Sequence, residues 1–148
     1  MSAKQHVYVG TYSLPIRFGT GEILEGKGKG IYLFEFDSGS AKLRLVNVTE
    51  NVDNPSFLAI NKDASRLYAV NELKTYNGQA TGAVSAFRIG EDRTLTLINR
   101  LPTGGTDPCH AVLSPDGRRV IVCNYMSGSV SVYPVGEDGA LGPREQFL

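Results

Sequence analysis

The residues of this chain best suited to chemistry are a histidine and a glutamate, His110 and Glu72, each beside an apolar, strand-like run. Imidazole groups titrate near neutral pH, so a histidine can take a proton from an attacking water, and a carboxylate can orient the ring. Amide and phenol groups can donate hydrogen bonds to substrate hydroxyls or to an oxyanion. The residues of these types beside the same or similar runs are Asn71, Asn124, Tyr12 and Tyr125.

Each of these residues also has a purely structural interpretation. A histidine at the start of a strand can hydrogen-bond a neighbouring loop, and Glu72 can be a carboxylate surrounded by water at the edge of the fold. Asn71 and Asn124 occupy equivalent positions of an internal repeat, and repetition is what structural roles produce, so their side chains can cap the turns that follow. His110 is the opposite case, because the repeat has Phe57 in its place.

The repeat spans nineteen residues and recurs 53 positions later. Residues 54–72 read NPSFLAINKDASRLYAVNE, and residues 107–125 read DPCHAVLSPDGRRVIVCNY. Without a gap, the two copies share a proline, an aspartate, an arginine and an asparagine, and apolar positions face apolar positions. Periods of roughly 40 to 50 residues built from short strands are typical of β-propellers, in which each repeat is one blade.

Strand-like runs and turns within each repeat predict an all-β fold of four-stranded antiparallel blades. The prediction is one partial β-propeller domain over residues 1–148, with blade 1 at about 1–50, blade 2 at about 51–103 and blade 3 at about 104–148. The predicted strands are 56–60, 66–71, 82–89 and 95–100 in blade 2, and 109–113, 119–124, 129–135 and a more polar last strand in blade 3. In blade 1, residues 7–12 and 30–34 match the second and third strands, and no inner strand precedes them.

Such blades bring the candidate residues together at one rim. The first two strands of a blade are joined at one end by a turn, at residues 61–65 in blade 2 and 114–117 in blade 3. The start of the first strand and the exit of the second therefore lie at the opposite end, around the mouth of the axial channel. The candidate residues that share this rim are His110, Asn124 and Tyr125 in blade 3, Asn71 and Glu72 in blade 2, and Tyr12 in blade 1.

Composition bounds the partners and the compartment. Fifteen basic and fifteen acidic residues give a formal net charge of zero, so no sustained positive field attracts nucleic acid or an anionic membrane. No apolar run approaches the roughly 20 residues of a membrane span, and the first residues lack the pattern of a signal peptide, so we expect a cytoplasmic protein. Cys109 and Cys123 are too few for a disulfide framework, which fits a reducing compartment, and a disulfide across their hairpin is left open as an alternative.

A glycine-rich insertion at residues 13–29 carries Arg17 and four further charged side chains, Glu22, Glu25, Lys27 and Lys29. Loops on a rigid scaffold are where specificity resides. The insertion lacks the Gly-Lys-Ser/Thr spacing of a nucleotide-binding phosphate loop, so we favour a basic loop that grips a phosphorylated sugar acid. The chain also lacks zinc-type Cys/His spacing and an acidic calcium loop, so no metal or other cofactor is expected.

Four segments make the chain resemble a known family: YVGTYS, GIYLFEFD, the first copy of the repeat and, above all, DPCHAVLSPDGRRVIVCNYMSGSVSVYPVGEDGAL. They are similar to the lactonase family of seven-bladed propellers over nearly the whole chain. The resemblance implies a complete protein more than twice this length, with about three of its seven blades present here. It also implies that His110 is the family's pocket histidine and that Glu72, Asn124 and Tyr125 occupy rim positions.

The chemistry that the resemblance implies is hydrolysis of a sugar lactone, with 6-phosphogluconolactone of the pentose phosphate pathway as the favoured substrate. His110 would act as the base, and Glu72 would orient it. The resemblance places further arginines and a glutamate in later blades, so we expect this chain alone to be inactive. Two alternatives are a cycloisomerase acting on a carboxymuconate and a propeller that binds protein or sugar without catalysis.

The predicted inner strands, 57–60 and 111–113, are apolar in succession, which is typical of strands buried on both sides. In a complete ring the next blade covers such strands, whereas here the end blades leave apolar faces for solvent or another chain. We therefore expect the purified chain to self-associate or to be poorly soluble unless further blades are supplied. Sedimentation velocity over a range of protein concentrations measures this, and a compact monomer at every concentration would contradict it.

Overall fold

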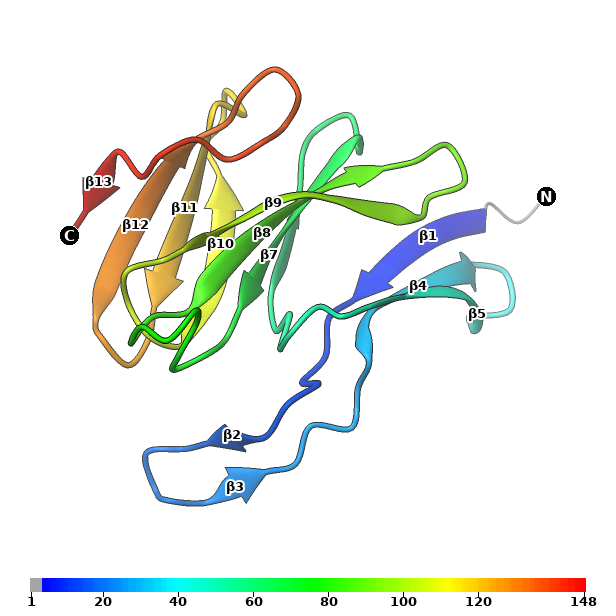
Figure 1. The fold of residues 1–148 in the computed structure, drawn as a ribbon. Coiled ribbons are helices and arrows are strands. Elements are labelled where there is room, and N and C mark those ends of the chain that lie inside the picture. The colour runs from blue at the N-terminus through cyan, green and yellow to red at the C-terminus, as the bar shows by residue number, and fades with distance from the viewer. Residues whose placement is uncertain (1–3) are drawn as a thin grey trace.

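The computed structural model describes residues 4–148, and these residues form a set of antiparallel sheets. Three sheets stand side by side, and a small two-stranded hairpin projects beyond them at one end (Figure 1). Within residues 4–148 there is no helix that could cross a membrane. The all-β fold class predicted from the repeat is confirmed.

The strands follow one another as neighbours in space. The first sheet contains β1 (Lys4–Val9), β4 (Gly30–Asp37) and β5 (Lys42–Glu50), in that order. The second contains β6 (Leu58–Ile60), β7 (Arg66–Asn71), β8 (Ala83–Ile89) and β9 (Leu95–Pro102), and the third contains β10 (Pro108–Leu113), β11 (Arg119–Asn124), β12 (Ser129–Pro134) and β13 (Gln146–Phe147). The projecting hairpin is β2 (Ile16–Arg17) with β3 (Ile23–Leu24), inserted between β1 and β4.

Of the strand boundaries that differ from the prediction, two lie where the first blade meets the second. β1 ends at Val9 instead of continuing to Tyr12, and a Cβ at Gly10 would clash with the carbonyl oxygen of Pro55. β6 begins at Leu58, because the preceding backbone turns: the Ser56 amide donates to the Asn54 carbonyl over 2.8 Å. At this point the two segments of backbone approach each other closely and do not pair as regular strands.

The turns that close the two inner hairpins are built alike. In the second sheet the Asp63 carboxylate accepts hydrogen bonds from the amide and hydroxyl of Ser65, at 3.1 and 2.7 Å. At the equivalent place Asp116 accepts from the Arg118 amide at 3.0 Å. Side chains of this kind satisfy backbone donors that the turn leaves unpaired.

The core lies between the sheets and follows from the period of two along a strand. In β7, Leu67 and Ala69 point toward the first sheet, and Tyr68 and Val70 point toward the third. The cluster between the first and second sheets comprises Ile31, Val52, Leu67, Ala69, Phe87 and Ile89. The cluster between the second and third comprises Tyr68, Val70, Val84, Ala86, Ala111, Val120, Val122, Tyr133 and Leu141. A strand of the middle sheet is therefore apolar on both faces.

The inner strands were predicted to be buried on both sides in a complete ring and to be partly exposed in the end blades of this chain. In the end blade, Val112 of β10 is 45% exposed, as expected, whereas in the middle blade Ile60 of β6 is 44% exposed, which was not expected. The strands buried on both faces are instead β7 and β8, the two middle strands of the second blade. An inner strand has a neighbouring strand on one edge only, so its burial depends on what lies across the axis.

Hydrogen bonds between blades add to the apolar contact. The Tyr68 hydroxyl donates to the Gly139 carbonyl over 3.0 Å, and the Tyr133 hydroxyl donates to the Pro102 carbonyl over 2.7 Å. Asn99 pairs with the backbone of Leu141 in both directions, at 2.7 and 3.0 Å. These bonds fix the second and third blades in one relative position, since they join a side chain of one blade to the backbone of the other.

Replacing Tyr68 by Phe is expected to lower the free energy of unfolding by about 1 to 2 kcal/mol, because it leaves the Gly139 carbonyl without its donor. Urea unfolding followed by circular dichroism measures the change. Tyr125→Phe is the matched control, since Tyr125 is 73% exposed. Equal stability of both variants would contradict the assigned role of the Tyr68 hydroxyl.

Candidate active site

The predicted rim is formed where β7 and β11 end and β10 begins. In the third sheet, Pro108 pairs with Asn124 and His110 pairs with Cys123, and the register shifts between these two pairs. Glu72 directly follows β7. Because β10 and β11 are antiparallel, His110 lies at the end of the blade from which Tyr125 leaves.

Tyr12 and Glu72 are brought into contact across the first two blades. The Tyr12 hydroxyl donates to Glu72 Oε2 over 3.0 Å. Burial, followed by the charge of Glu72 and this hydrogen bond, raises the pKa of Tyr12 to about 12. Tyr12 therefore remains a neutral phenol near neutral pH, and its hydroxyl proton is donated to the Glu72 carboxylate.

His110 is supported by packing. Its ring lies against Phe57, with ring centroids 4.4 Å apart and planes inclined by 46°. The two residues are counterparts in the repeat and touch each other from neighbouring blades. Within residues 4–148 no hydrogen bond joins Glu72 to the imidazole, so the predicted orienting role of Glu72 has no direct contact behind it, and Phe57 is the residue that holds the ring.

Cys109 lies between the histidine and the start of the strand. Its thiol donates to the Cys123 carbonyl over 3.9 Å, and both cysteines are free. The disulfide left open by the sequence is therefore not formed. Burial, followed by the nearby Glu72 carboxylate, raises the pKa of the Cys109 thiol, which disfavours the thiolate that nucleophilic chemistry requires.

Asn71 and Asn124 are enclosed within their blades. Asn71 is fully buried, donates to the Asp53 carbonyl over 2.7 Å and accepts from the Ser85 hydroxyl over 2.6 Å. Asn124 is 2% exposed and donates to the hydroxyls of Ser129 and Ser131 at 3.1 and 3.3 Å. These contacts favour the structural interpretation of both asparagines over direct substrate binding.

A cavity of about 290 Å³ opens beside Glu72. The β2–β3 hairpin forms one wall, and the rim of the second and third blades forms the other. Its lining consists of Ile16, Arg17, Phe18, Gly19, Glu72, Lys74, Asp107, Tyr125 and Met126. Lys74 and Asp107 were not among the predicted site residues, because each is an ordinary loop residue in the sequence and only the fold brings them together.

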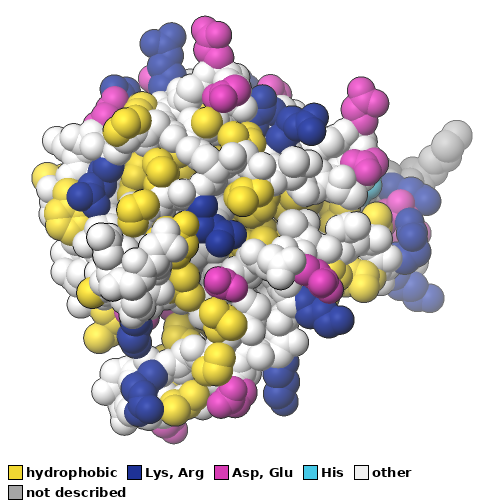
Figure 2. Space-filling model, viewed as in Figure 1, with side chains coloured by type: hydrophobic (Ala, Val, Ile, Leu, Met, Phe, Trp, Pro, Cys, Tyr) yellow, Lys and Arg dark blue, Asp and Glu magenta, His cyan; other side chains and the backbone are white. Residues whose placement is uncertain are grey.

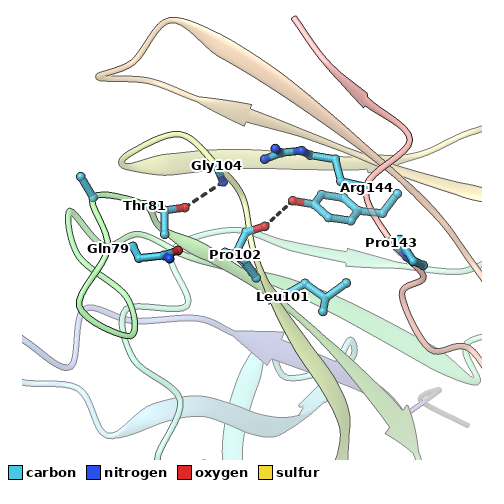
Figure 3. Close-up of a pocket in the computed structure, with 9 residues that line it drawn as sticks. Gln79, Thr81, Leu101, Pro102, Gly104, Pro143 and Arg144 are labelled. Atoms are coloured by element: carbon cyan, nitrogen blue, oxygen red, sulfur yellow. Dashed lines mark hydrogen bonds between the residues drawn. The ribbon is translucent and has the colours of Figure 1, made fainter.

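A second cavity, of about 450 Å³, lies between the second and third blades and shares no lining residue with the first (Figure 3). Polar groups around it are bonded to each other: the Gly104 amide donates to Thr81 Oγ1 over 2.8 Å, and Arg144 donates to the Thr103 carbonyl over 2.8 Å. The Arg144 guanidinium also covers the Phe147 ring, 4.7 Å from its centroid. Because these polar groups already have partners, this cavity between the blades is a weaker candidate for chemistry than the rim.

Comparison with known proteins gives a consistent result. Residues 6–148 match the model of a family described as lactonase, 7-bladed beta-propeller. The chain is 34% identical over 135 residues to a 6-phosphogluconolactonase of Bacillus subtilis and 31% identical over 122 residues to one of Formosa agariphila. These matches cover 90% and 82% of this chain but only 34% of each relative, so the chain spans about a third of their length.

Solved structures agree with the sequence matches. A protein of Bacteroides fragilis described as a putative 6-phosphogluconolactonase superposes with a TM-score of 0.80 at 35% identity, over 98% of this chain and 36% of that one. A periplasmic gluconolactonase of Pseudomonas aeruginosa superposes with a TM-score of 0.83 at 30% identity, over 99% of this chain and 39% of that one.

The Tyr12–Glu72 contact predicts an alkaline titration. Absorbance at 295 nm, taken as the difference between the wild type and Tyr12→Phe, should show a phenol that ionises near pH 12, and Glu72→Gln should move it down toward the ordinary value of 10. Because the folded pKa is the higher one, this group's contribution to stability is complete below pH 10 and is lost as the pH rises to about 12. An unchanged titration in Glu72→Gln would contradict the contact.

Proposed function

Because the chain belongs to the lactonase family of seven-bladed β-propellers, we propose that it supplies three blades of an enzyme that hydrolyses a sugar lactone, with 6-phosphogluconolactone as the favoured substrate. Relatives that carry the name 6-phosphogluconolactonase support this choice. The chain covers about a third of those relatives, so residues of further blades are expected to complete the site.

The observation that carries the proposal is His110. It is exposed at the rim, it departs from the repeat, and its ring is held by Phe57. An imidazole positioned by packing keeps its ring nitrogens available to water and substrate. That arrangement suits a base that must accept a proton and return it.

In the proposed reaction, His110 removes a proton from a water molecule as the water oxygen bonds to the lactone carbonyl carbon. The resulting tetrahedral oxyanion collapses and breaks the bond between the carbonyl carbon and the ring oxygen. The ring oxygen leaves as a hydroxyl after taking the proton back from the imidazolium, and the product is the open sugar acid. No redox partner is needed, since the step is a hydrolysis.

The other rim residues have binding roles in this proposal. Tyr125 projects into solvent, so its hydroxyl can donate to the oxyanion or to a substrate hydroxyl. Glu72 retains Oε1 to accept from a substrate hydroxyl, because Tyr12 occupies Oε2. Tyr12 then acts through Glu72 as a positioning residue.

A cytoplasmic location is part of the proposal. Both cysteines are free, and free thiols are typical of reducing compartments. One similar protein is named as periplasmic, so cell fractionation is the direct test.

Replacing His110 by Ala is expected to lower the turnover number for freshly prepared 6-phosphogluconolactone by about 100-fold or more, because the general base is lost. The assay uses the longest polypeptide in which this chain occurs, with gluconolactone and a carboxymuconate as comparison substrates. His6→Ala is the matched control, since His6 lies on β1 away from the rim residues. Wild-type turnover in His110→Ala would refute the assigned base, and turnover of the carboxymuconate alone would favour a cycloisomerase.

A further inference from the structure

The β2–β3 hairpin reaches from the first blade to the third. Ile16, Arg17 and Phe18 line the 290 Å³ cavity together with Tyr125 and Met126, which follow β11. The hairpin therefore lies across the rim end of the second blade. Figure 2 shows it at the lower end of the view, where basic, acidic and hydrophobic side chains gather close together.

A buried asparagine of the repeat holds the base of this hairpin. Asn54 Oδ1 accepts hydrogen bonds from the backbone amides of Ser13 and Leu14, at 2.9 and 2.8 Å. The backbone N–H of Asn54 in turn donates to the Ser13 hydroxyl over 3.0 Å. Asn54 is only 1% exposed. The wall that carries Arg17 is thus tied to the second blade at its root.

The counterpart of Asn54 in the third blade is Asp107, and it holds a lysine. Lys74 Nζ lies 2.9 Å from Asp107 Oδ1 and 3.0 Å from Oδ2. The Asp107 side chain is 5% exposed and the Lys74 side chain is 44% exposed. Both residues line the cavity, and the Lys74 side chain is the more exposed of the two.

Arg17 adds a second cation to the cavity. One of its terminal nitrogens donates to the Gly21 carbonyl over 3.3 Å, within the hairpin. Within residues 4–148 this is the one hydrogen bond of the Arg17 side chain, so its other N–H groups are available to a ligand. Two cations from different elements thus line a cavity whose other wall carries Glu72.

We propose that Arg17 and Lys74 bind the phosphate of a phosphorylated sugar lactone, so that the β2–β3 hairpin selects phosphorylated over unphosphorylated substrates. The inference rests on the proposed function, and it places the substrate beside Glu72, which lines the same cavity. A phosphate monoester presents close to two negative charges and three acceptor oxygens. Arginine binds such a group with two parallel hydrogen bonds, and lysine binds it as a point charge.

Binding of gluconate 6-phosphate and of gluconate, measured by isothermal titration calorimetry, tests the proposal without turnover. The wild type should prefer the phosphorylated acid by at least about 10-fold, since a hydrogen bond to a charged group contributes that much to affinity. Arg17→Gln should reduce this preference by about 10-fold and leave the affinity for gluconate unchanged. Arg118→Gln is the matched control, because Arg118 lies beside the turn at the opposite end of the third blade.

Lys74 requires a gentler change, because removing its charge leaves Asp107 buried without a partner. Lys74→Arg keeps the ion pair and should keep the preference. The proposal is overturned if the wild type shows no preference, or if Arg17→Gln weakens both ligands equally or neither. Both measurements use the longest polypeptide in which this chain occurs, and phosphate selectivity without lactonase turnover in that polypeptide would refute the proposed function alone. Normal turnover with an unchanged preference in Arg17→Gln would refute this inference alone.

Discussion

Contact between apolar sheet faces is the constraint on which the rest of this structure depends. A four-stranded blade is apolar on both faces, and each face is buried only when another blade lies against it. In β7 the alternation of side chains sends Leu67 and Ala69 to one neighbour and Tyr68 and Val70 to the other. A blade in the middle of the chain therefore cannot be stable alone, and its position is determined by both neighbours at once.

The location of the candidate site follows from that packing. Stacked blades with the same strand order direct the starts of their inner strands and the exits of their second strands to one end. Tyr12 of the first blade meets Glu72 of the second, and Phe57 of the second meets His110 of the third. Each of these contacts joins two blades, so the geometry of the rim is only as rigid as the interface between them. The Tyr68 and Asn99 hydrogen bonds to the third blade thus contribute to the site as well as to stability.

Much of the fold could be predicted from the sequence, because the repeat encodes what happens within a blade. Turn residues such as Asp63 and Asp116, and the period of two in the strands, specify hairpins locally. What happens between blades is not encoded in this way. The ion pair of Lys74 with Asp107 joins residues 33 positions apart that have no shared pattern, and the reach of the hairpin to Tyr125 depends on how the blades are stacked. The burial of β6 in the middle blade was overestimated for the same reason, since an apolar run does not reveal what lies across the axis.

Comparison of the two copies of the repeat separates structural from specialised residues more sharply than either copy alone. Asn71 and Asn124 are identical in both copies, are buried, and form side-chain hydrogen bonds within their own blades. Phe57 is replaced by His110, and Asn54 is replaced by Asp107, and both exchanges occur at the rim. The first exchange converts a hydrophobic ring into an acid–base group that still packs on its own counterpart. The second converts an amide that holds backbone into a carboxylate that holds a cation beside the cavity. A scaffold that repeats for stability can therefore diverge at rim positions where the new residue keeps a packing or polar contact, as His110 does with Phe57 and Asp107 does with Lys74.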